Sequence, residues 1–229
     1  MKKPLKLNGL RTFMSLVKPQ TAAYWASRSR FDKGDWGEDP NIAVDWINGY
    51  LKSRLHPHRQ LIVDAVASLK ADSVLEIGCS CGPNLVRLSD KFPDMKLGGI
   101  DVNADSIAFG KGVLPQAALH VGNFKHLPWA NSVFDVIIAD AVLMYCDPDE
   151  IHDVFAEMDR VAAKGIIIID RFDRSIKGKP HAGGHIWARD YGAWLKRFGY
   201  KVKKRRITKK DWPTSKNWQL FGKIWIGTK

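Results

Sequence analysis

The stretch Ser73 to Asn84 reads S-V-L-E-I-G-C-S-C-G-P-N, and it decides the fold. Its apolar run ends near the acid Glu76 and gives way to a glycine-containing turn, after which Pro83 to Phe92 is compatible with a helix. This order predicts a strand, a tight loop and a helix N-terminus. Backbone N–H groups and the positive end of the helix meet small ligands at such junctions. We therefore expect a nucleotide or cofactor site here.

The spacing of the glycines narrows the choice between classes of ligand. A dinucleotide site requires G-x-G-x-x-G, but counted from Gly78 the second and third glycine positions hold Ser80 and Pro83. The stretch instead resembles motif I of the class I S-adenosylmethionine-dependent methyltransferases, acid-x-Gly-x-Gly-x-Gly, matched here by Glu76, Gly78, Ser80 and Gly82. Ser80 departs from that motif. A strand-to-helix turn with ordinary turn glycines is the alternative interpretation of this stretch alone.

Short apolar runs alternate with helix-like stretches from Ser73 onward, a rhythm typical of βαβ units and a parallel sheet. Right-handed crossovers then place helices on both faces. Together with the resemblance, this predicts an α/β, three-layer, doubly wound, mostly parallel seven-stranded sheet with a C-terminal antiparallel hairpin. We expect the strands at Ser73–Ile77, Lys96–Asp101, Ala118–Val121, Phe134–Ala139, Gly165–Asp170, Tyr200–Ile207 and Gln219–Gly227.

The expected helices before the sheet are Ile42–Leu51 and His58–Leu69, and a later one spans about Ala188 to Phe198. Residues 1–41 are interpreted as a basic N-terminal extension or lid, and residues 42–229 as one methyltransferase domain. His56 and His58 flank a proline at a helix start, and we expect them to be cap or surface residues.

Length and composition favour one core. The chain has 229 residues, 45% of them hydrophobic, and no apolar run approaches the ~20 residues of a membrane span. No signal-peptide pattern follows Met1. Three cysteines are an odd count, and Cys79-x-Cys81 lacks a second pair at zinc-like spacing, which disfavours disulfides and metal alike. These features predict a cytoplasmic protein without a membrane partner.

The formal charge of +12 indicates an anionic partner. Basic residues concentrate in Lys196–Lys210, which holds nine Lys or Arg, and in Met1–Arg30. Such clusters can follow nucleic-acid phosphates. The alternative, which we favour, is a solvated strand edge and a loose basic terminus.

Three further motifs extend the resemblance to roughly Ser73–Lys229. Asp101 stands 23 residues beyond Gly78, at the end of the next predicted strand, in a segment similar to motif II. A carboxylate there, with Val102 beside it, is expected to accept both ribose hydroxyls. The alternative role for Asp101 is to cap the following helix, for which Asn103 and Asp105 compete.

The resemblance also implies how the rest of S-adenosyl-L-methionine is held. Asn123 matches the residue that bonds the adenine amino group, with Asn in place of the usual Asp, and Phe124 flanks the ring. Phe134–Asp140 is similar to motif IV, whose strand-end carbonyl, at Ala139 or Asp140, meets the methionine amino group. In an N-terminal segment similar to the helix that related enzymes fold over the cofactor, Tyr24 or Arg28 is expected at the methionine carboxylate, and core packing is the alternative.

The acceptor is expected to be a small molecule, anionic or aromatic. His181 and His185 follow the fifth predicted strand and are predicted to act as a base or to line the acceptor pocket, a solvated loop being the alternative. Two other functions stay open. One is RNA methylation with Lys196–Lys210 as the phosphate track, and the other is a catalytically silent protein that binds a partner through its basic surface.

Overall fold

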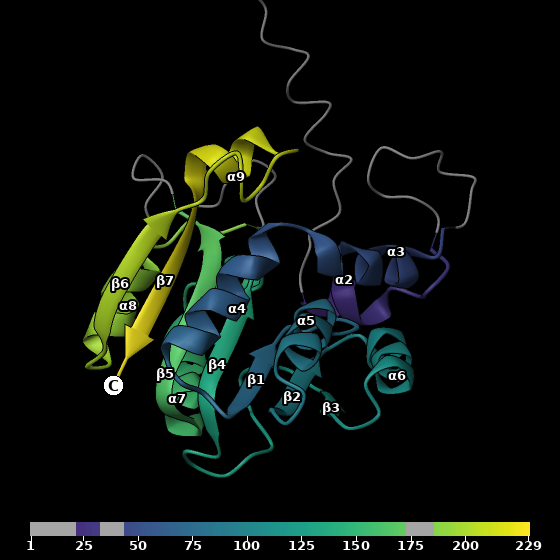
Figure 1. Cartoon of the computed structure of the whole chain (residues 1–229), viewed down its shortest axis with the longest axis horizontal. Coiled ribbons are helices and arrows are strands. Elements are labelled where there is room, and N and C mark those ends of the chain that lie inside the picture. Colours follow the sequence, from purple (N-terminus) through teal and green to yellow (C-terminus); the bar gives the residue numbers. More distant parts are fainter. Residues whose placement is uncertain (1–21, 33–43, 173–185) are drawn as a thin grey trace, which may run out of the picture.

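The computed structural model of the chain describes residues 22–32, 44–172 and 186–229. Seven strands form one sheet (Figure 1): β1 Ser73–Ile77, β2 Lys96–Asp101, β3 Ala118–Val121, β4 Phe134–Asp140, β5 Ala162–Arg171, β6 Lys201–Arg206 and β7 Gly222–Thr228. The helices are α2 Ala22–Ser27, α3 Trp46–Lys52, α4 His58–Ser68, α5 Pro83–Lys91, α6 Ala104–Val113, α7 Ile151–Val161, α8 Tyr191–Arg197 and α9 Lys216–Phe221, with 3-10 turns η1 Ser53–Leu55 and η2 Leu143–Tyr145.

The sheet has the order β3-β2-β1-β4-β5-β7-β6. Strands β1 to β5 pair in parallel, whereas β7 runs antiparallel to both of its neighbours. The predicted mostly parallel sheet with an antiparallel C-terminal pair is confirmed. The chain winds outward from β1 to β3 and then restarts at β4 on the other side of β1. The two halves therefore diverge between β1 and β4, which is where doubly wound sheets bind ligands, at the carboxyl ends of the strands.

Alternating side chains of the central strands enter two separate cores. On β5, Ile166 and Ile168 pack with residues of α7 and α8, whereas Ile167 and Ile169 pack with residues of α4, α5 and α6. This follows from the period of two in a strand, and a strand covered on both faces reads as a continuous apolar run. The predicted three layers are therefore confirmed.

Several predicted elements differ from the structure in their bounds, among them β5, which begins at Ala162, and α8, which begins at Tyr191. Gln219–Gly227 is not a strand throughout, because Lys216–Phe221 is helical and β7 begins only at Gly222. The side chain of Ser215 accepts a hydrogen bond from the Trp218 N–H at 3.4 Å, an N-cap that favours the helix. Similarly, α3 begins at Trp46 rather than Ile42, after the cap Asp45.

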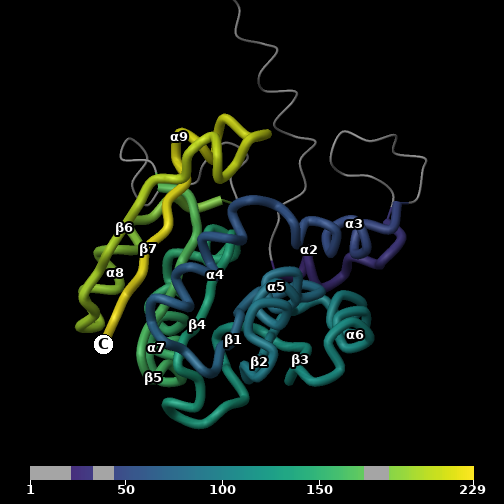
Figure 2. The backbone as a smooth tube through the Cα atoms, in the orientation of Figure 1, coloured from purple at the N-terminus to yellow at the C-terminus, as the bar shows by residue number. Residues whose placement is uncertain are grey.

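Figure 2 shows α2 and α3 on one side and α9 on the other, at the end of the sheet toward which the arrowheads of β4 and β5 point in Figure 1. Helices α2 and α3 on one side and α9 on the other thus flank the carboxyl ends of the parallel strands. Within the described ranges, no helix has the length and apolarity needed to cross a bilayer.

Candidate active site

A pocket of about 700 Å³ lies at the carboxyl ends of the parallel strands. This volume falls within the range of about 300 to 1,000 Å³ that small-molecule sites occupy. Its walls come from α2, α3, η1, the start of α4, the loops after β1, β2, β3 and β4, and the segment 212–218. The pocket therefore forms where the topology predicts a ligand.

The loop after β1 has a left-handed backbone at three alternate residues. The φ angles are +66° at Gly78, +50° at Ser80 and +82° at Gly82. A Cβ atom on Gly78 would overlap the side chain of Val142, so this position requires glycine for space as well as conformation. The same backbone explains why the motif prefers glycine where this chain has Ser80, since a left-handed residue with a side chain costs about 1 to 2 kcal/mol.

Asp101, at the end of β2, holds the backbone of this loop by a hydrogen bond. Its two carboxylate oxygens accept hydrogen bonds from the backbone N–H groups of Ser80, at 2.8 Å, and Asn103, at 2.9 Å. The side chain of Asn103 caps α6 by accepting from the Ser106 N–H at 2.7 Å, so the alternative role of Asp101 as the helix cap is excluded. Burial raises the pKa of Asp101 and outweighs the backbone N–H groups, which lower it.

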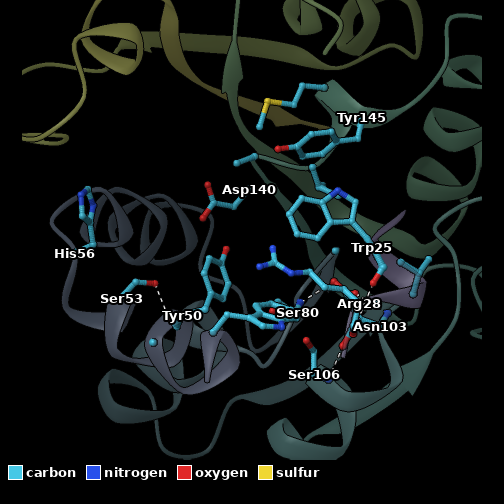
Figure 3. Close-up of a pocket in the computed structure, with 18 of the residues that line it drawn as sticks. Trp25, Arg28, Tyr50, Ser53, His56, Ser80, Asn103, Ser106, Asp140 and Tyr145 are labelled. Carbon is cyan, nitrogen blue, oxygen red and sulfur yellow. Dashed lines mark hydrogen bonds between the residues drawn. The ribbon is translucent and has the colours of Figure 1, made fainter. Parts of the chain in front are cut away.

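The N-terminal segment closes one side of the pocket (Figure 3). The amide of Asn103 donates to the carbonyl oxygens of Trp25, at 2.8 Å, and Arg28, at 2.7 Å, which ties α2 to the start of α6. The Arg28 side chain is buried, and its guanidinium lies 4.8 Å from the centre of the Trp46 ring. Arg28 thus lines the pocket, whereas Tyr24 packs edge-on against Trp25 and lies outside the pocket lining.

Of the two residues predicted to contact the adenine, only one lines the pocket. Phe124 lines the pocket, but Asn123 does not, and its side-chain oxygen accepts from the Lys125 N–H at 2.6 Å. On β4, Ala139 is buried in the sheet whereas Asp140 reaches the pocket.

Beneath the pocket, Asp140 anchors a buried polar cluster. Its Oδ2 atom accepts from Asn84 Nδ2 at 3.0 Å and Arg59 at 3.3 Å, and it lies 3.0 Å from His58 Nε2. Burial alone would raise the pKa of Asp140, but His58 and Arg59 outweigh it and lower the pKa to about 2. His58 is 3% exposed. The expectation of a cap or surface residue at position 58 is therefore wrong, because its ring is needed as a partner for a buried carboxylate.

Glu76 belongs to the same cluster. Its Oε1 atom accepts from Asn84 Nδ2 at 2.6 Å, while Oε2 is buried with no hydrogen-bond partner in the part of the chain that the structure describes. Burial raises the pKa of Glu76 to about 8, against the lowering effect of the Asn84 hydrogen bond. The acid of the motif therefore lies below the loop and supports it.

The structure brings seven of the twelve predicted positions that it describes to one pocket. Those that line it are Arg28, Gly78, Ser80, Asp101, Val102, Phe124 and Asp140. Those outside the lining are Tyr24, Glu76, Gly82, Asn123 and Ala139. His181 and His185 lie outside the described residues.

Sequence reasoning missed the end of the pocket that lies near α9. His56, His58, Trp212, Thr214 and Trp218 line it, and the Trp212 and Trp218 rings stack with centres 4.2 Å apart. In the sequence, only the triplet His56-Pro57-His58 before a helix marks this end of the pocket. Trp212 lies far along the chain and meets the two histidine rings only in the folded structure.

The basic stretch Lys196–Lys210 lies away from the pocket. Strand β6 occupies the sheet edge beyond β7, and the side chains of Lys203, Lys204, Arg205 and Arg206 are exposed. Arg205 pairs with Asp211 at 2.9 Å, and no β6 residue lines the pocket.

Known proteins share this domain. Residues 74–165 match the family model of a methyltransferase domain. The chain is 31% identical over 135 residues to trans-aconitate 2-methyltransferase of Afipia carboxidovorans, covering 57% of this chain and 51% of that protein. A second trans-aconitate 2-methyltransferase, from Rhodopseudomonas palustris, is 32% identical over 113 residues, covering 47% of this chain and 43% of that one. The chain thus spans about half the length of the curated relatives it matches.

Solved structures share the fold at lower identity. A protein from Pyrococcus horikoshii has a TM-score of 0.59 at 16% identity, covering 90% of this chain and 98% of that one. The plantazolicin methyltransferase solved with SAH has a TM-score of 0.58 at 16% identity, covering 80% and 89%. The matched methyltransferase domain covers residues 74–165, and the likeness to the solved structures shows that the described chain has the class I methyltransferase fold.

Proposed function

We propose that the chain transfers a methyl group from S-adenosylmethionine to a small-molecule acceptor. The observation that carries this proposal is the arrangement of Asp101 and Ser80: a half-buried carboxylate holds the left-handed loop after β1 at the wall of the pocket. Each oxygen of Asp101 accepts one backbone N–H and keeps capacity for a further donor, which suits the two hydroxyls of a ribose.

In this proposal the remaining predicted residues contact other parts of S-adenosylmethionine. Gly78 and Ser80 allow the methionine end to approach the main chain, and Phe124 flanks the adenine, with Asn123 at its amino group. The end of β4, at Ala139 or Asp140, meets the methionine amino group. Arg28, which lines the pocket, meets the carboxylate in this proposal, and Tyr24, which lies outside the lining, is the alternative.

When bound, the sulfonium of S-adenosylmethionine supplies an activated methyl group for an in-line displacement. Correct positioning of the acceptor then supplies much of the rate. The protein's contribution is a pocket that orients both molecules and excludes water, formed by the loop after β1 on one side and α2 with α3 on the other.

The acceptor is proposed to be small, and either anionic or aromatic. The relatives named for trans-aconitate support an anionic acceptor. Residues 1–41 are proposed as an extension or lid over the domain 42–229, with His181 and His185 near the acceptor, in a cytoplasmic protein.

Calorimetry with S-adenosylmethionine tests the cofactor site. Asp101→Ala is expected to weaken binding by about tenfold to 100-fold, because hydrogen bonds to a charged group contribute about 1.5 to 3 kcal/mol. Asp94→Ala, at an exposed position in the turn between α5 and β2, serves as the control. An Asp101 variant that keeps its thermal unfolding transition and binds as tightly as the wild type would overturn the proposed site.

Two assays separate the competing functions. Transfer of labelled methyl to trans-aconitate and other small carboxylates tests the acceptor class. Salt-dependent RNA binding that is lost when Lys203 to Arg206 are neutralised would support the RNA alternative. Absence of S-adenosylmethionine binding would favour the catalytically silent alternative.

A further inference from the structure

Helix α2 and the turn that follows it, residues 22–32, contribute one wall of the pocket without a buried helical face. The helix has six residues, and none of them is buried. Isolated helices shorter than about 12 to 15 residues are marginal in water, and most helices in proteins are stabilised by packing of an apolar face. Specific contacts with the rest of the protein therefore hold the segment 22–32 in place.

Asn103, the N-cap of α6, joins this segment to the predicted ribose site (Figure 3). Its backbone N–H donates to Asp101 Oδ1 at 2.9 Å, and its side-chain oxygen accepts from the Ser106 N–H at 2.7 Å. Its Nδ2 atom donates to the carbonyl oxygens of Trp25, at 2.8 Å, and Arg28, at 2.7 Å. These partners fix the orientation of the amide, because only the NH2 group donates and only the oxygen accepts. Asn103 is 2% exposed.

The two N–H donors distinguish asparagine from the other capping residues at this position. Asn, Asp and Ser are about equally good N-caps, so capping α6 does not by itself require asparagine. Of the three, only asparagine also carries an NH2 group. The two carbonyls that accept from it lie at the end of α2 or just after it, where carbonyls lack partners within the helix. Asn103 thus caps the N-terminus of α6 and the C-terminus of α2 together.

Other contacts of the segment 22–32 are less enclosed. Arg30 forms two hydrogen bonds with Asp45, at 3.0 Å and 2.7 Å, and its backbone N–H donates to Asp105 at 2.9 Å. None of these three residues is buried. Asn103 is buried and is itself bonded to Asp101. It therefore connects the segment directly to the carboxylate that is predicted to bind the ribose.

We propose that Asn103 is a positioning residue that fixes the segment 22–32 at the pocket and thereby slows the release of S-adenosylmethionine. The inference rests on the proposed function, in which Asp101 accepts from the ribose and Arg28 meets the methionine carboxylate. Asn103 bonds both of these residues, Asp101 through its backbone N–H and Arg28 through its side chain. Without the side-chain bonds, the segment has to be ordered when the cofactor binds, which costs affinity.

The coupling acts in both directions, as linkage requires. A cofactor that contacts Asp101 and Arg28 holds the segment 22–32 in place in addition to Asn103. Bound S-adenosylhomocysteine, which keeps the ribose and the carboxylate, is therefore expected to slow hydrogen exchange in this segment.

Asn103→Ser separates the two functions of the side chain. Serine caps α6 about as well as asparagine, but its single short hydroxyl cannot donate to both carbonyls. The affinity of the full chain for S-adenosylhomocysteine is measured by calorimetry, and its dissociation by chasing labelled ligand with unlabelled ligand. Affinity is expected to fall by about fivefold to 100-fold, the effect of two neutral hydrogen bonds, mostly through faster dissociation.

Two further variants separate positioning from capping. Asn131→Ser, the same substitution at an exposed site before β4, at the opposite end of the sheet, is expected to bind and release the ligand as the wild type does. Asn103→Ala removes the cap as well, so it is expected to unfold at a lower temperature than Asn103→Ser while binding the ligand equally weakly. A role in capping alone predicts instead that Asn103→Ser binds normally.

Hydrogen exchange of residues 22–32, measured with and without S-adenosylhomocysteine, tests the coupling in the wild type itself. The ligand is expected to slow exchange there, and Asn103→Ser is expected to exchange faster than the wild type before ligand is added.

The inference is overturned if Asn103→Ser binds and releases the ligand as the wild type does. It is equally overturned by a wild type in which the ligand leaves exchange of residues 22–32 unchanged. Either result with intact binding by the wild type counts against the inference alone. Failure of the wild type to bind S-adenosylhomocysteine overturns the proposed function, and this inference with it.

Discussion

Replacing Glu76 by Gln tests how the buried acid beneath the loop after β1 contributes to the free energy of unfolding. Glu76 is 2% exposed, and burial raises its pKa from an ordinary value of 4.5 to about 8. Because the folded-state pKa is raised, the folded protein holds this proton more tightly than the unfolded chain. The stabilisation is complete below the ordinary pKa and is lost as the pH rises toward 8.

The size of the effect follows from the two pKa values. Each pKa unit corresponds to about 1.4 kcal/mol, so the whole interval from 4.5 to about 8 is equivalent to about 5 kcal/mol in the free energy of unfolding. Between about pH 5 and about pH 8 the wild type should lose about 3 to 4 kcal/mol through this residue. Glutamine imitates the protonated acid and keeps an oxygen for the amide of Asn84, so the variant should not show this loss.

The assay is urea unfolding of the ligand-free protein, followed by tryptophan fluorescence at several pH values across that window. The difference in unfolding free energy between Glu76→Gln and the wild type should grow with pH, whereas Asp94→Asn, at an exposed site, should run parallel to the wild type. Asp140, with its pKa near 2, titrates below this window and affects both proteins equally. Parallel curves for Glu76→Gln and the wild type would refute the reasoning.

Three further predictions concern local backbone and capping. Gly78→Ala should destabilise the protein by about 2 to 4 kcal/mol in urea unfolding and abolish cofactor binding, because it combines a left-handed backbone with overlap against Val142. Gly112→Ala, a helical site with open space around it, should be neutral or slightly stabilising and is the control. Ser80→Gly should raise stability by about 1 kcal/mol by removing left-handed strain, and an unchanged or lower unfolding midpoint contradicts this. Asp190→Ala should cost about 1 kcal/mol in the same assay, because its side chain caps α8; an unchanged midpoint would show that water replaces the cap.

The sequence by itself determined the sheet and the left-handed loop after β1 that forms one wall of the pocket. Strand periodicity is local, and an apolar run such as Ile166–Ile169 can be buried on both faces only in a covered sheet. The glycine loop is equally local, because its left-handed residues are adjacent in the chain and Asp101 follows at the end of the next strand.

The tertiary structure alone decided the second half of the pocket. His58 lies 82 residues before Asp140, and Trp212 comes later still, so no sequence period relates them. The triplet at His56 is compatible with a solvated helix start, and only the return of segment 212–218 over α4 buries it. The carboxyl ends of parallel strands meet at one edge of the sheet in a predictable way. His56, His58 and Trp212, far apart in the chain, meet there only through tertiary packing, which has no local sequence signature.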